Sequence, residues 1–252
     1  MPLRALRRDR AARTGAQLFL HEWAFDDCLA RLALIQQRFG RALLIGCPDP
    51  DWPERLGSFA ETMQVRDPGP LFAAAADGDP IVEDEWEPEA SAYDLVLALG
   101  TLDTVNDLPL ALRLIRHAMR PGALFLGAFS GGETLPRLRN AMRAADSLSG
   151  TAAPHVHPRI EASALAPLLA AAGFVRVVVV VDRVPVSYPS LACLVHDLRA
   201  MAATNVLKER PRFLGKAAYE AAARNFVASG ADERTVETFE ILHFAAWTQQ
   251  KA

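Results

Sequence analysis

Cysteine is scarce in this chain of 252 residues, and its three copies stand far apart. Cys28, Cys47 and Cys193 are odd in number, and none of them belongs to a C-x-x-C spacing. Such a set provides neither a disulfide framework nor the ligands of a structural zinc site. The sequence therefore indicates a reducing compartment, and we predict a cytoplasmic protein.

Long apolar runs are missing as well. The apolar run from Gly173 to Val181 contains Arg176 and is far shorter than the roughly 20 residues that span a bilayer. No apolar stretch of secretory type follows the arginine-rich N-terminus, so we expect no signal peptide. We predict a soluble protein that is not an integral membrane protein.

Positive charge is not in excess. The chain has 27 Lys and Arg against 30 Asp and Glu, a formal net charge of −3, which argues against a nucleic-acid partner. Five arginines do gather near the N-terminus, at positions 4, 7, 8, 10 and 13. We interpret them as a solvated helix face, with a surface for an acidic partner or membrane headgroups as the alternative.

Short apolar runs alternate with helical patterns from residue 41 onward, which is typical of parallel strands joined by crossover helices. Strands are expected at residues 42–45, 62–66, 81–82, 93–99, 124–129, 175–181 and 238–247. With 51% apolar residues the chain can bury the core of a large domain. The pattern predicts an α/β domain over 41–252, an N-terminal helical extension over 1–40 and a helical insertion at about 189–236.

Acidic residues and glycines follow the first four expected strands, where ligands bind in open parallel sheets. Asp67 is the expected ligand of a ribose diol, and Asp84 or Glu85 could meet an adenine amino group. The alternative is a plain turn at 67–69 and a solvated acidic loop at 83–89. The predicted cofactor-binding residues are Gly46, Cys47, Asp67, Asp84, Glu85, Gly100 and Leu102.

The pattern as a whole resembles the class I S-adenosylmethionine-dependent methyltransferases. The resemblance is carried by residues 42–47, 93–96, 114–126 and 171–174, and covers about residues 40–185. It implies a Rossmann-like sheet of seven strands with helices on both faces, in which strand 175–181 is antiparallel or at the edge. It also implies S-adenosylmethionine as cofactor and methyl transfer to an acceptor that the sequence does not identify.

A narrower likeness includes V-N-D-L-P at 105–109, P-H-V-H-P at 154–158 and further motifs at 125–128, 131–135, 197–205 and 238–241. These segments are similar to the bacterial relatives of mitochondrial complex I assembly factor 5. That group is often labelled similar to the malonyl carrier-protein methyltransferases of biotin synthesis. The likeness implies an assembly factor whose acceptor is a protein such as a respiratory complex I subunit.

The cofactor turn departs from the family pattern, in which the first strand ends acidic-x-Gly-x-Gly-x-Gly. Leu44 stands at the acidic position, and Pro48 and Pro50 replace the second and third glycines. Proline removes an amide donor and its ring takes space that the cofactor needs. A non-catalytic assembly or interaction factor is therefore an alternative to methyl transfer. The resemblance to the assembly factor implies a second alternative, a protein-arginine hydroxylase-like assembly factor.

One close pair of histidines, His155 and His157, lies in the P-H-V-H-P motif. Non-haem iron oxygenases use two histidines and a carboxylate, but no carboxylate follows the pair at a telling spacing. We interpret the pair as structural or substrate-facing and predict no metal site. The spacing of the sequence assigns no catalytic residue.

Overall fold

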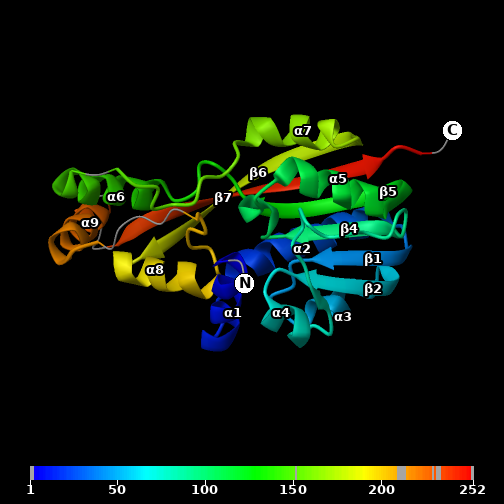
Figure 1. Ribbon diagram of the computed structural model, residues 1–252, viewed down its shortest axis with the longest axis horizontal. Helices are drawn as coiled ribbons and strands as arrows, with labels where there is room; N and C mark the ends of the chain where they lie inside the picture. The colour runs from blue at the N-terminus through cyan, green and yellow to red at the C-terminus, as the bar shows by residue number, and fades with distance from the viewer. Residues whose placement is uncertain (1–2, 151, 209–213, 229, 231–233, 251–252) are drawn as a thin grey trace.

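The computed structural model describes residues 3–150, 152–208, 214–228, 230 and 234–250 (Figure 1). Within them, seven strands form one sheet in the order β3-β2-β1-β4-β5-β7-β6. The strands are β1 (Phe39–Ile45), β2 (Ala60–Asp67), β3 (Asp79–Pro80), β4 (Tyr93–Leu99), β5 (Met119–Ser130), β6 (Phe174–Tyr188) and β7 (Thr235–Thr248). The seven-stranded α/β fold expected from the sequence is confirmed.

Parallel pairing joins β3, β2, β1, β4 and β5, whereas β7 pairs antiparallel with both β5 and β6. The strand predicted at 175–181 is therefore the edge strand, as expected, and the antiparallel strand is β7. The edge strand β6 continues through Pro185 to Tyr188, and an edge position is where a strand tolerates proline. The third strand lies at Asp79–Pro80, so the expectation of 81–82 was wrong.

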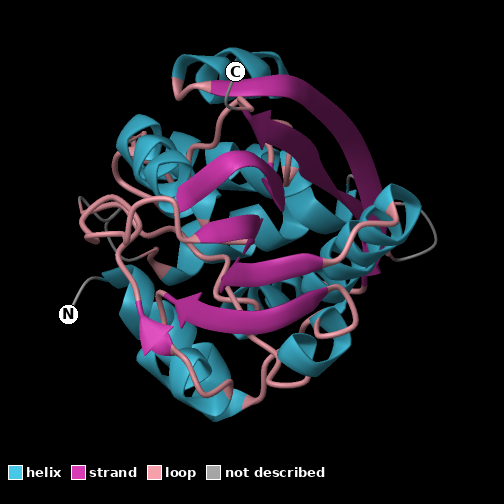
Figure 2. Ribbon diagram, turned by 90° about the vertical axis from the view of Figure 1, so that its right-hand side faces the viewer, coloured by secondary structure: helices cyan, strands magenta, loops and turns pink. Residues whose placement is uncertain are grey.

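Helices cover both faces of the sheet (Figure 2). Helices α5 (Leu108–Ala118) and α7 (Ala162–Ala171) bury apolar side chains against one face. Helices α2 (Phe19–Ile35) and α3 (Trp52–Leu56) pack against the other, where Phe25 stacks on Trp52. Helix α1 (Leu3–Thr14) precedes α2 in the chain. The short helix α4 (Pro70–Ala75) follows β2, and the 3-10 turn η1 (Leu102–Thr104) follows β4.

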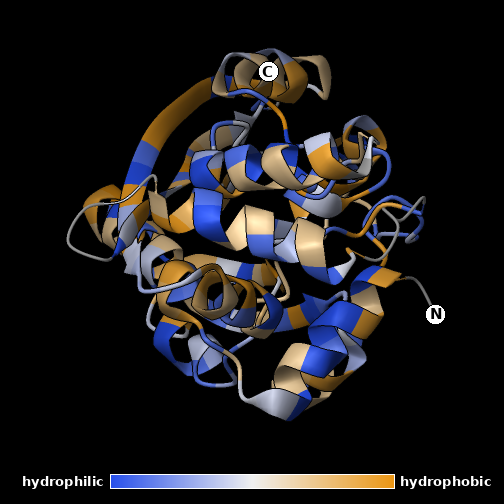
Figure 3. Ribbon diagram, turned by 90° about the vertical axis from the view of Figure 1, so that its left-hand side faces the viewer, coloured by the Kyte–Doolittle hydropathy of each residue, from blue (hydrophilic) through white to orange (hydrophobic). Residues whose placement is uncertain are grey.

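A separate lobe lies beyond the outer ends of β6 and β7 (Figure 1). It contains α6 (Pro136–Ser149), α8 (Leu191–Ala200) and α9 (Lys216–Ala228), of which α8 and α9 form the insertion before β7. Its core is apolar and includes Leu194, Phe226 and Phe239. Along the helices that face the viewer in Figure 3, hydrophilic and hydrophobic residues alternate, as amphipathic packing requires.

Over the described part of the chain, no helix combines the length and the apolar character needed to cross a membrane.

Candidate functional site

The turn after β1 is folded tightly onto the end of β4. Gly46 has a φ of +84°, and a Cβ atom at this position would lie 2.1 Å from the carbonyl oxygen of Leu99. Only glycine fits such a backbone at such a distance. The N–H of Gly46 donates to the carbonyl oxygen of Arg66 at 2.8 Å. This amide is therefore used within the protein.

Asp67, the predicted ribose ligand, ends β2 and is fully buried. Its Oδ2 accepts from the N–H of Cys47 at 2.8 Å, and its Oδ1 accepts from the N–H of Gly69 at 2.7 Å. The same two oxygens accept from Arg8, Oδ1 from Nε at 2.7 Å and Oδ2 from Nη2 at 2.5 Å. A carboxylate offers about four acceptor positions, so Asp67 is saturated by the protein itself.

Arg8 reaches Asp67 from α1 and is 4% exposed. Its guanidinium lies over the ring of Phe72, 5.2 Å from the centroid, and a Cβ atom on Gly69 would come within 2.6 Å of its Cβ. Burial by itself would lower the pKa of Arg8, but the adjacent Asp67 carboxylate outweighs it and the pKa is raised. Arg8 is therefore a permanently charged group in a pocket built around it.

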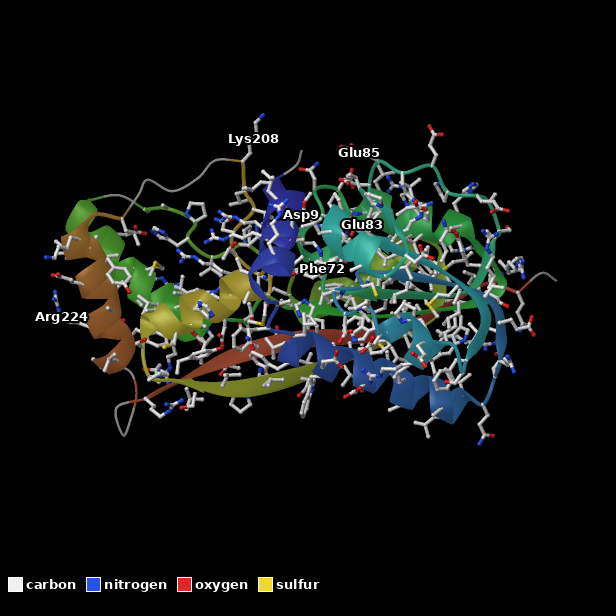
Figure 4. The ribbon with its side chains drawn as sticks, turned by 90° about the horizontal axis from the view of Figure 1, so that it is seen from below. Asp9, Phe72, Glu83, Glu85, Lys208 and Arg224 are labelled. Carbon is white, nitrogen blue, oxygen red and sulfur yellow. The ribbon has the colours of Figure 1, made fainter. Side chains whose placement is uncertain are left out.

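Two more side chains of α1, those of Arg4 and Asp9, hold the helix against the sheet edge and α4. Arg4 donates to both carboxylate oxygens of the buried Glu83, at 2.5 and 2.7 Å, and to the carbonyl oxygen of Thr101 at 2.5 Å. Asp9 accepts from the N–H of Leu71 at 3.0 Å, in the first turn of α4. In Figure 4, Asp9 and Glu83 are grouped where α1 meets α4. The interpretation of the N-terminal arginines as a solvated face is thus wrong for Arg4 and Arg8.

The acids predicted to meet adenine have other surroundings. Asp84 accepts from the N–H of Asp107 at 2.8 Å, and Asp107 in turn caps α5 by accepting from the N–H of Leu110. Glu85 is exposed at the surface. Their neighbour Glu83, which the sequence did not single out, is the acid that α1 engages.

A cavity of about 70 Å³ lies between α1, α2, the end of α8 and the carboxyl ends of β4 and β5. Of the predicted site residues, Gly100 lines it, while Leu102 is buried in the apolar core under α5. His21 packs on Gly100, where a Cβ atom would lie 2.9 Å from its Cδ2. Burial lowers the pKa of His21 to about 4, with a smaller contribution from Arg8, and its Nδ1 is buried without a partner. This imidazole is neutral at pH 7.

A third buried ion pair closes the far side of the cavity. Arg159 donates to Asp103 at 3.0 Å, with 2% and 6% of the two side chains exposed, and to the carbonyl oxygen of His157. The histidines of the P-H-V-H-P motif face different partners. His155 contacts Asp146 at 2.8 Å and His157 contacts Asn205 at 3.3 Å. Among the described residues, no three His, Cys, Asp or Glu side chains converge in a metal-ligand arrangement.

Sequence reasoning found Asp67 and Gly100 because they end strands, but it missed Arg4, Arg8, His21 and Arg159. A signal was present in α1. Arg4 and Arg8 are four residues apart and share a face with Ala5 and Ala11, two small residues that become buried. Small residues beside long cationic side chains allow a helix to pack closely while the arginine stems are buried.

The family model described as a methyltransferase domain matches residues 16–179. The chain belongs to this family. It is 34% identical over 171 residues to the mitochondrial arginine-hydroxylase NDUFAF5 of Danio rerio, covering 66% of this chain and 53% of that protein. It is 31% identical over 159 residues to the malonyl-[acyl-carrier protein] O-methyltransferase of Xylella fastidiosa, covering 62% and 52%. The chain thus spans about half the length of these curated relatives.

Solved structures show the same fold. The YcgJ protein of Bacillus subtilis has a TM-score of 0.60 at 10% identity, covering 88% of this chain and 97% of that one. Phosphoethanolamine N-methyltransferase 2 of Haemonchus contortus, in complex with S-adenosyl-L-methionine, has a TM-score of 0.54 at 16% identity, covering 92% and 57%. At such identities the likeness concerns the fold. The family match supports the predicted cofactor, S-adenosylmethionine.

Asp67 is the kind of acceptor that the ribose of that cofactor needs, but Arg8 of α1 donates to it here. A buried carboxylate ends β2 beside the point where the strand order reverses, between β1 and β4, which is where open α/β sheets bind nucleotides. In the arrangement seen here, its oxygens are all held by the protein. While Arg8 donates to both oxygens of Asp67, that carboxylate has no acceptor position left for the hydroxyl groups of a nucleoside.

Proposed function

We propose that this chain is a methyltransferase-like protein that binds S-adenosylmethionine at the carboxyl edge of the sheet, with Asp67 accepting hydrogen bonds from the ribose diol. The observation that carries the proposal is the position of Asp67. It is a fully buried carboxylate at the end of β2, and the N–H of Cys47 links it to the turn after β1. Such an acid next to the strand switch is the feature that recognises ribose in this class of sheet.

Other residues of the edge would hold the rest of the cofactor. Asp84 and Glu85 stay the proposed partners of the adenine amino group. Gly46, which has no side chain, would let the cofactor approach the backbone of the turn after β1 closely. Gly100 and the cavity beside His21 would receive the methionine end. The bound cofactor supplies the methyl group, and the protein contributes mainly by aligning the acceptor with it.

For the acceptor we propose a protein, such as a respiratory complex I subunit, because the motifs of the chain resemble those of complex I assembly factor 5. We further propose a reducing, cytoplasmic location. It is supported by the three free cysteines, two of which are buried. Burial raises the pKa of Cys28 to about 12, so that thiol is inert at neutral pH.

Calorimetric titration with S-adenosylmethionine and S-adenosylhomocysteine tests the proposal. We expect a saturable heat in the wild type and at least a tenfold loss of affinity in Asp67→Asn, compared at matched folded fraction. Asp79→Asn is the matched control, because Asp79 is an exposed carboxylate on the neighbouring strand β3. The absence of any binding at millimolar ligand, in folded protein, contradicts cofactor binding by the wild-type chain.

The second candidate is a non-catalytic assembly or interaction factor. It is favoured by the saturation of Asp67 and by the prolines of the turn, where Pro48 is buried. Restoring glycine at Pro48 and Pro50 tests whether the turn limits binding. Restoring an acid at Leu44 does not belong in that test, because Leu44 is fully buried in the apolar cluster between the sheet and α2 and would become an unpaired buried charge.

The hydroxylase-like alternative has less support from the geometry. His155 and His157 bind separate partners, Asp146 and Asn205, and so do not form two corners of a facial triad with a carboxylate. It stays an alternative because the relatives include proteins named arginine-hydroxylase.

A further inference from the structure

We propose that α1 is an internal plug of the cofactor site, and that a nucleoside binds only when Arg8 is released from Asp67 and α1 leaves the carboxyl edge. The inference rests on the proposed function, since it concerns regulation of the same site. It makes cofactor binding and docking of α1 mutually exclusive.

The first step is the acceptor capacity of Asp67. Cys47 and Gly69 donate to it from the backbone turns that shape the edge, and Arg8 takes the two positions that remain. A ribose diol brings two hydroxyl donors, which need two acceptor positions. The positions that can be freed without unfolding a turn are those of Arg8.

The second step is that Arg8 cannot give up Asp67 and stay where it is. It is 4% exposed, enclosed by Phe72 and Gly69, and a buried guanidinium without its carboxylate is strongly disfavoured. Arg4 and Asp9 are fixed on the same helix, to Glu83 and to the first turn of α4. Release of Arg8 therefore involves the whole of α1.

The third step is that α1 is held by contacts that can be exchanged. The only apolar side chains it buries among its described residues are those of Ala5 and Ala11, so undocking exposes little apolar surface. Its polar contacts include the two ion pairs and the hydrogen bonds of Arg4 and Asp9 to backbone groups, and water or a ligand can replace such contacts at small net cost. The apparent affinity for the cofactor is then the intrinsic affinity multiplied by the fraction of molecules in which α1 is undocked.

Ala11→Glu is the sharpest variant, because Ala11 is a fully buried residue of α1 and is not one of the residues that donate to Asp67. Leu6→Glu adds the same charge to the same helix at a position that is 48% exposed, and so serves as the matched control. We expect S-adenosylmethionine to bind Ala11→Glu at least tenfold more tightly than the wild type. Leu6→Glu should bind as the wild type does.

A second readout uses trypsin, for which the arginines of α1 are cleavage sites. Adenosine should accelerate cleavage within residues 4–13 of the wild type, as followed by mass spectrometry. Dideoxyadenosine that lacks the ribose diol should not accelerate cleavage, because it cannot compete with Arg8 for Asp67. Near-UV circular dichroism checks that each variant keeps its packed core.

The outcomes separate the two proposals. Equal, tight binding by the wild type and Ala11→Glu, or protection of α1 by adenosine, overturns the plug and leaves cofactor binding intact. If S-adenosylmethionine fails to bind Ala11→Glu although trypsin shows α1 released, the proposed function is overturned together with its regulation. Tighter binding in Ala11→Glu with accelerated cleavage by adenosine supports both.

Discussion

The carboxyl edge of the sheet and the outer lobe are stabilised in different ways. At the edge, three arginines are buried against three carboxylates, in the pairs Arg8–Asp67, Arg4–Glu83 and Arg159–Asp103. In the lobe, α6, α8 and α9 pack on the ends of β6 and β7 through side chains such as Leu194 and Phe226, both fully buried.

The difference separates specificity from stability. Burying two charges costs desolvation that their attraction roughly offsets, so a buried pair adds little net stability although the loss of one partner is severe. Apolar burial is favourable at each site and tolerates small changes of geometry. The lobe is thus suited to hold shape, and the edge is suited to specify one arrangement of its charged groups.

The largest effect is expected from breaking one buried pair. Asp67→Leu leaves the buried N–H groups of Cys47 and Gly69 without an acceptor as well as Arg8 without its carboxylate. We expect a loss of about 3–5 kcal/mol in the free energy of unfolding, measured by urea denaturation. The double change Asp67→Leu with Arg8→Met should recover only the part due to the unpaired charge, because the N–H groups of Cys47 and Gly69 still lack an acceptor. A double variant as unstable as the single one would show that the lost backbone acceptor, and not the unpaired charge, sets the cost.

A cavity in the lobe should cost somewhat less. We expect Leu194→Ala, on α8, to lower the free energy of unfolding by about 3 kcal/mol, the usual cost of removing a buried leucine side chain. Leu148→Ala, at a position that is 63% exposed, is the control and should change it by less than about 0.5 kcal/mol. A small effect at Leu194 would mean that the lobe repacks freely, against the comparison drawn above.

Acid should weaken the edge through His21. Its folded pKa of about 4 is below the ordinary value, so the unfolded chain binds the proton more tightly, and stability present at pH 7 is lost as pH falls from about 6.5 to 4. We expect His21→Gln to remove about 2 kcal/mol of the difference in unfolding free energy between pH 7 and pH 4.5. The cost of Leu194→Ala should be the same at both pH values. An unchanged pH dependence in His21→Gln would refute the burial of a neutral imidazole.

The smallest effect is expected at an exposed ion pair. Arg41 donates to Glu89 at 2.9 Å, with 36% and 66% of the two side chains exposed. We expect Arg41→Gln to change the free energy of unfolding by less than about 1 kcal/mol, and less still in 0.5 M salt, because solvent screens the pair. A loss comparable to that of Asp67→Leu would mean that burial does not set the worth of the ion pairs in this protein.

Much of the architecture follows from the sequence because it depends on local pattern. The run Y-D-L-V-L-A-L predicts β4 with the bounds that the structure shows. Alternating strands and helices predict that the first strands pair in parallel, and the placement of Asp67 at a strand end follows from the same pattern.

The tertiary structure alone decided what Asp67 and Glu83 contact. Their partners Arg8 and Arg4 lie 59 and 79 residues away along the chain. The local sequence around an arginine on a short helix is the same whether its side chain faces solvent or a buried carboxylate. Local patterns report the preferences of neighbouring residues, whereas the choice between these two environments depends on a long-range balance of desolvation against ion pairing. For that reason the sequence indicates which strand end carries Asp67, and only the tertiary structure shows that α1 docks there.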